Sequence, residues 1–100
     1  MRICSFDVGI KNLAFVIIQN DIIQEWDVLT MNSKTTEALC VELVSVLDAH
    51  PSLLTCDVAL IEKQPSRNNK MRIVEAFLQT YFVIRGVTNE KSNMKKSIVY

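Results

Sequence analysis

Residues 2–29, RICSFDVGIKNLAFVIIQNDIIQEWDVL, decide the fold that this sequence predicts. The stretch holds three runs rich in apolar, β-branched and aromatic residues, which are typical of β-strands, at residues 2–7, 13–19 and 22–29. Gly9 marks a turn after the first run, and Asn20-Asp21 offers a two-residue turn of the kind that joins antiparallel strands. The stretch therefore predicts a three-stranded meander.

A helix and a fourth strand are predicted after the meander. Residues 37–49 carry apolar side chains at helical spacings of three and four, behind a polar run that supplies helix-capping residues. Pro51 ends this helix, because the residue before a proline avoids the helical region. A short apolar strand closed by a charge follows at residues 58–62.

A second helix and a last strand complete the prediction. The helix is expected to run to about Arg85 and to end at Gly86, from a cap at Ser66, Asn68 or Asn69. Residues 97–100 begin a further strand. The order βββ-α-β-α-β predicts an α/β fold in which helices pack on a mixed sheet, with residues 1–100 in one small domain.

The composition is that of a globular protein and gives no global charge signal. The 11 Lys and Arg residues balance 11 Asp and Glu residues, so contact with nucleic acid would depend on local patches. No apolar run reaches the roughly 18 residues of a membrane span. The first strand begins at Arg2, which leaves no room for a leader peptide. We therefore expect a soluble intracellular protein.

Asp7 and Glu62 are the residues that suggest chemistry. Each ends an apolar strand, where an unpaired carboxylate is costly to bury, and Gly9 lets the backbone approach a phosphate or metal closely. If the two strands are neighbours, both carboxylates converge, and two converging acids repel unless a cation lies between them. Their oxygens suit Mg²⁺ or Mn²⁺. The alternatives are a turn cap at Asp7 and a surface ion pair at Glu62.

Four basic residues and no acid occupy residues 63–72, which we call the basic segment: Lys63, Arg67, Lys70 and Arg72. The basic segment spans the loop after Glu62 and the start of the second helix, and helix N-termini attract phosphate. A nucleic-acid backbone that passes the two carboxylates would meet it. The alternative is a solvated helix face. His50 is expected to be a polar cap, and Trp26 is expected to pack rather than to stack on bases.

Two segments resemble a known family. Residues 4–14, CSFDVGIKNLA, are similar to the first-strand motif of RuvC-type Holliday-junction resolvases, in the branch found in poxviruses, related large DNA viruses and fungal mitochondria. Residues 61–65, IEKQP, followed by Asn69-Lys70-Met71, resemble the second acidic motif of the same branch. The first motif is far more specific than Asp-x-Gly alone, and the resemblance runs through essentially all 100 residues.

The resemblance implies a ribonuclease-H-like fold and a homodimer in which each subunit nicks one of two opposed strands at a four-way DNA junction. It implies that Asp7 and Glu62 bind Mg²⁺, with Mn²⁺ as an alternative, for phosphodiester hydrolysis. Lys11, Asn12 and the basic segment would position the phosphate backbone. The apolar second helix would supply part of the dimer interface.

The family also completes its site with two aspartates on a C-terminal helix, and no such helix is present in the sequence. We therefore expect a fragment of a longer protein or a degenerate product, with weak metal binding and no efficient cleavage. The alternatives are a non-catalytic DNA-binding or dimerisation module and, less favoured, an actin/Hsp70-like ATPase subdomain. The absent leader favours a virus that replicates in the host cytoplasm, with the mitochondrion or the nucleus as alternatives.

Overall fold

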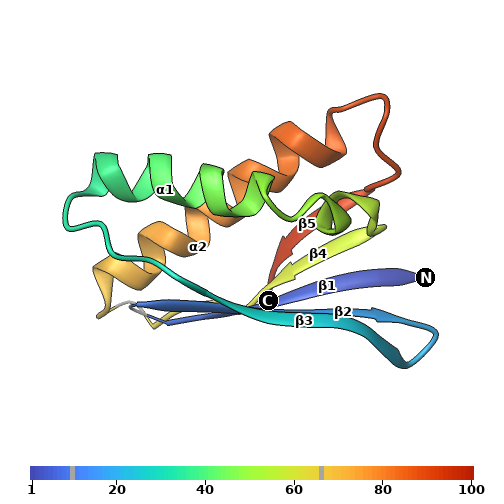
Figure 1. The fold of residues 1–100 in the computed structure, drawn as a ribbon, viewed down its shortest axis with the longest axis horizontal. Helices are drawn as coiled ribbons and strands as arrows, with labels where there is room; N and C mark the ends of the chain where they lie inside the picture. The colour runs from blue at the N-terminus through green and yellow to red at the C-terminus, as the bar shows by residue number, and fades with distance from the viewer. Residues whose placement is uncertain (10, 66) are drawn as a thin grey trace.

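The structure is a computed structural model that describes residues 1–9, 11–65 and 67–100. The predicted order of elements is confirmed, although Ser66, one candidate helix cap, lies outside the described residues. Figure 1 shows the elements, whose bounds are β1 Arg2–Val8, β2 Asn12–Gln19, β3 Ile22–Thr30, α1 Thr36–Asp48, the 3₁₀-helix η1 Pro51–Thr55, β4 Val58–Ile61, α2 Asn69–Phe82, the π-helical segment η2 Val83–Val87 and β5 Lys96–Val99.

The strands form one mixed sheet in the order β3-β2-β1-β4-β5. The meander is antiparallel, whereas β4 runs parallel to both β1 and β5. Asn20 and Asp21 have φ angles of 53° and 65°, the left-handed conformation that two-residue hairpin turns favour. The predicted turn is therefore confirmed, and β1 lies at the centre of the sheet.

Both helices cover the same face of the sheet (Figure 1). The Thr35 side chain caps α1 by accepting a hydrogen bond from the N–H of Ala38, and each helix turns one apolar stripe to the core. Phe82 of α2 is fully buried against Phe6 of β1, with ring centroids 5.3 Å apart. The α/β fold class is confirmed. No helix in the described residues is long and apolar enough to cross a membrane.

The edge strand β3 directs Trp26 and Val28 away from the helices, whereas Leu29 is buried on the helix side. Trp26 pairs with Val16 on the face that α1 and α2 do not cover, and it is 70% exposed. Asp27 pairs instead with the buried Phe15, on the helix side, where its carboxylate lies 3.5 Å from the His50 ring. The expectation that Trp26 packs against other residues is therefore wrong, because strand alternation places Trp26 on the open face, between the acids Glu25 and Asp27 on the helix side.

The second helix ends differently from the prediction. The α-helical hydrogen bonding stops at Phe82, and the chain continues as a π-helical segment through Val87. Gly86 lies inside that segment with a negative φ, so it is not the predicted left-handed cap. A Cβ atom at Gly86 would lie 2.7 Å from the Met94 sulfur. The glycine is thus required by a close contact with the loop before β5 rather than by helix termination.

Candidate functional site

Asp7 and Glu62 lie side by side on the open face of the sheet. In β1 the side chains of Phe6 and Val8 are buried, and Asp7 between them is exposed on the opposite face. Phe6 pairs with Ile61 of β4, and the Glu62 N–H donates to the Phe6 carbonyl at 3.2 Å. The next residues along the two strands are therefore neighbours. Parallel pairing brings together two acids that are far apart in the sequence.

The proximity of Asp7 changes the ionisation of Glu62. A hydrogen bond shared with Asp7 is the largest cause that raises the pKa of Glu62 above its usual value, and the Asp7 charge and partial desolvation add to it. A cation between two such carboxylates would favour their ionised forms. Carboxylate oxygens are the ligands that Mg²⁺ and Mn²⁺ prefer, so the pair fits a hard divalent cation.

Lys11 and Asn12 follow Asp7 in the sequence, where the chain turns from β1 into β2. The Gly9 N–H donates to the Asn12 carbonyl at 2.8 Å, and a Cβ atom at Gly9 would lie 2.8 Å from that same oxygen. The Met31 N–H donates to the Lys11 carbonyl at 2.8 Å. Gly9 is therefore needed for a tight turn, whose backbone is held while the Lys11 and Asn12 residues remain exposed.

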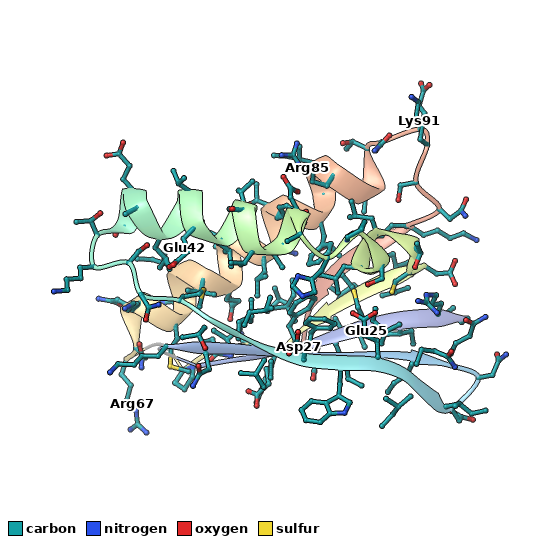
Figure 2. All side chains as sticks on the ribbon, in the orientation of Figure 1. Glu25, Asp27, Glu42, Arg67, Arg85 and Lys91 are labelled. Carbon is teal, nitrogen blue, oxygen red and sulfur yellow. The ribbon has the colours of Figure 1, made fainter. Side chains whose placement is uncertain are left out.

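The basic segment follows the strand that leads to Glu62. All four of its basic residues are exposed, and the Asn68 side chain starts α2 by accepting the Met71 N–H at 3.2 Å. Figure 2 shows Arg67 at the same end of the molecule as the β1–β2 turn. The ion pairs found in the described part of the chain, His50–Asp27 and Arg85–Asp48, involve none of these four cations.

A hollow of about 540 Å³ surrounds the acid pair on the open face. Exposed aromatic side chains border it from both sides of the carboxylates, Trp26 from β3 and Tyr100 after β5. Across the residues that the structure describes, no group of three or more His, Cys, Asp and Glu side chains is arranged to hold a metal. Asp7 and Glu62 therefore form a two-carboxylate pair within a partly apolar recess.

Two residues at the site are not among the predicted site residues, although Gln64 lies within the IEKQP segment. Gln64 is buried, and its side-chain amide donates to the Glu62 carbonyl at 2.7 Å. The Gln64 backbone N–H donates to the carboxylate of Glu75, on α2, at 2.5 Å. A polar residue before a proline is typical of a loop, and Glu75 occupies an ordinary helix position. Only the packing of α2 against the end of β4 connects them.

The chain is similar in fold to three solved proteins that cover it almost entirely. RuvC of T. thermophilus in complex with a Holliday junction substrate is 9% identical with a TM-score of 0.70, over 100% of this chain and 65% of its own. The Fowlpox virus resolvase in complex with Holliday junction DNA is 24% identical, with a TM-score of 0.63 over 100% and 60%. The yeast mitochondrial Holliday junction resolvase is 19% identical, with a TM-score of 0.61 over 98% and 51%.

These matches establish the ribonuclease-H-like fold, and the chain spans between about half and two thirds of the length of these proteins. A search of curated proteins finds no match. The sequence profile of the family described as Poxvirus A22 protein matches residues 1–97. Because that match covers nearly the whole chain, this protein belongs to the Poxvirus A22 protein family.

Proposed function

We propose that the chain supplies part of the active site of a DNA endonuclease that resolves four-way (Holliday) junctions by Mg²⁺-dependent phosphodiester hydrolysis. The adjacent placement of Asp7 and Glu62 along one hollow of the open sheet face carries this proposal. It is supported by two fold relatives that are complexes with Holliday junction DNA. Residues 1–100 are then an incomplete nuclease domain, and the remaining ligands come from outside them.

Asp7 and Glu62 would hold Mg²⁺, or Mn²⁺ in its place, through their carboxylate oxygens. When bound, the cation lowers the pKa of a coordinated water and stabilises the charge that develops on the phosphoryl group. Lys11 and Asn12 bind the phosphate of the strand to be cut, because the Gly9 turn holds them just beyond Asp7. The basic segment binds the same strand on the Glu62 side.

A binding and nicking assay on a four-way junction tests the proposal. We expect residues 1–100 to bind the junction in preference to a linear duplex of the same sequence, and to leave it uncut with Mg²⁺ or Mn²⁺. Two carboxylates alone hold the metal too weakly for efficient hydrolysis. Equal binding to junction and duplex would contradict the assignment of four-way junctions as the substrate. Efficient cleavage by this chain would contradict the claim that its metal site is incomplete.

The DNA-binding role of the basic segment has its own test. Replacing Lys63, Arg67, Lys70 and Arg72 with Ala is expected to weaken binding to all DNA forms and to lower the slope of log K against log salt by about one per lost phosphate contact. Replacing Lys91, Lys95 and Lys96, which lie outside the segment, removes three positive charges instead of four and serves as a control. Equal slopes for the two variants would contradict the assignment.

We further propose that the protein acts as a homodimer through an apolar groove between α1 and α2. The groove has a volume of about 400 Å³, and Leu43, Phe77 and Ile84 are among the residues that line it. Ile84 is 58% exposed, an unusual position for a large apolar side chain beside other apolar residues. Ile84→Glu is expected to give a monomer in sedimentation experiments, and Ile22→Glu, at another exposed site, is not.

We also propose the host cytoplasm as the site of action. The match to a poxvirus protein family and the likeness to a Fowlpox virus resolvase support a viral source. A tagged copy expressed in infected cells is expected to gather at cytoplasmic sites of viral DNA synthesis. Accumulation in mitochondria or in the nucleus would contradict this location.

A further inference from the structure

We propose that Gln64 and Glu75 are positioning residues, which hold the backbone of Glu62 so that its carboxylate meets Asp7. The inference rests on the proposed function, in which Glu62 is a metal ligand. It assigns to one buried amide and one helix carboxylate a role in the geometry of the site rather than in contact with metal or DNA.

Gln64 is the clearest sign of such a role. It is only 6% exposed and is the one polar or charged residue that is buried in the described part of the chain. A buried amide is costly unless its hydrogen bonds are made. The Gln64 side chain makes one of these with the Glu62 carbonyl at 2.7 Å, two residues back along the chain. That bond closes a compact loop just past the end of β4.

Backbone hydrogen bonds tie the segment at Glu62 to the chain on both sides of β4. The Glu62 N–H donates to the Phe6 carbonyl at 3.2 Å, and the next N–H, from Lys63, donates to the Tyr100 carbonyl at 2.8 Å. Between these two donors lies the Glu62 carbonyl, which β4 no longer pairs because the strand ends at Ile61. The Gln64 side-chain amide donates the hydrogen bond that this carbonyl accepts. The peptide after Glu62 is therefore held at its N–H by the Tyr100 carbonyl and at its C=O by the Gln64 side chain.

Glu75 connects this loop to α2. Its carboxylate accepts the Gln64 backbone N–H at 2.5 Å, and hydrogen bonds to an ionised acceptor are stronger than those between neutral groups. Glu75 belongs to α2, and two nearby residues of that helix, Val74 and Leu78, are buried in the core. The core thus holds the helix, the helix holds Gln64, and Gln64 holds the backbone of the Glu62 ligand.

Four variants of the 100-residue chain separate positioning from simple stability. Gln64→Met keeps the length of the side chain but removes the donor to the Glu62 carbonyl. Glu75→Leu removes the acceptor for the Gln64 N–H, and Glu75→Gln retains an acceptor oxygen at the same place. Val46→Ala, at a half-buried position packed against the core on α1, lowers stability without touching the loop.

Electron paramagnetic resonance titration with Mn²⁺ measures the dissociation constant of each folded variant. Loss of a residue that orients a metal ligand typically lowers the affinity for the metal roughly 10- to 100-fold. We expect an effect of this size in Gln64→Met and Glu75→Leu, and a dissociation constant near that of the unmutated chain in Glu75→Gln and Val46→Ala. Unchanged Mn²⁺ affinity in Gln64→Met overturns the inference.

The double variant Asp7→Asn, Glu62→Gln shows whether the metal site itself is correct. If it binds Mn²⁺ as tightly as the unmutated chain does, the proposed metal site fails. Amide hydrogen exchange then decides the positioning role without metal. Faster exchange of the Glu62 and Lys63 amides in Gln64→Met, with core rates unchanged, supports the role, and unchanged exchange at both amides overturns it.

Discussion

The hydroxyl of Tyr81 is expected to be a main stabiliser of the packing between α1 and α2. It donates to the Asp48 carboxylate at 2.5 Å, and Arg85 donates to both oxygens of the same carboxylate at 3.2 and 3.3 Å. Tyr81→Phe removes only the first of these bonds. A hydrogen bond to a charged group contributes about 1.5–3 kcal/mol. The Asp48 side chain is 44% exposed, so solvent screening leaves about 1.5 kcal/mol at most.

That loss corresponds to a fall of roughly 6–12 °C in melting temperature for a domain of this size. The effect should depend on pH, since the bond with Tyr81 is the largest cause that lowers the pKa of Asp48 from its usual 3.8. A lowered pKa contributes stability above the usual value, and this stability is lost as the pH falls through the lowered one. The difference between Tyr81→Phe and the unmutated chain should therefore be full at pH 7 and shrink below about pH 4.

Thermal and urea unfolding followed by circular dichroism at pH 7 and pH 3 measure this difference. Tyr100→Phe is the matched control, because Tyr100 is 60% exposed and its hydroxyl makes no hydrogen bond in the described residues. It should unfold like the unmutated chain. Equal unfolding midpoints for Tyr81→Phe and Tyr100→Phe at pH 7, or a difference that persists undiminished at pH 3, would refute the reasoning.

Three further outcomes follow from the structure. Asp7→Asn should lower the pKa of Glu62 towards its usual value in a carbon-13 NMR titration. In the unmutated chain the raised pKa makes Glu62 contribute stability at low pH, and this stability is lost as the pH rises through the raised pKa. An unchanged Glu62 titration in Asp7→Asn would contradict the proximity of the two carboxylates. Gly86→Ala should lower the free energy of unfolding in urea by about 1–2 kcal/mol, because crowding against Met94 outweighs the gain in helix propensity. A variant more stable than the unmutated chain would contradict this expectation. Phe82→Ala should lower the free energy of unfolding by about 3–5 kcal/mol, whereas Trp26→Ser should change it by less than about 0.5 kcal/mol. Similar losses of stability in the two variants would show that the open face is covered.

Much of the fold follows from local signals. Asn and Asp tolerate the left-handed backbone that Asn20 and Asp21 adopt, so the hairpin turn could be predicted from adjacent residues. The leucines of α1 repeat at helical spacing, and the same three leucines are buried. The direction of Trp26 is different, since alternation along β3 leaves open which face the helices will cover.

The candidate site depends on pairing between distant segments. Asp7 and Glu62 lie together only because β1 and β4 are parallel neighbours in one register. From the sequence, this pairing could be stated as a condition but could not be determined. The contact of Gly86 with Met94 and the bond of the Gln64 N–H to Glu75 join residues that no sequence motif connects. These residues are determined by how α2 packs against the sheet, which requires the structure.

Paramagnetic broadening of nitrogen-15 NMR signals by Mn²⁺ tests the central claim most directly, because it locates the cation on the chain. The account predicts that the amides of Asp7, Ala14 and Glu62 broaden first at low Mn²⁺ and that Mg²⁺ reverses the effect. The double variant Asp7→Asn, Glu62→Gln should lose this pattern. Broadening centred on other acids, such as Asp48 or Asp57, or a pattern that survives in the double variant, would contradict a metal site formed by Asp7 and Glu62.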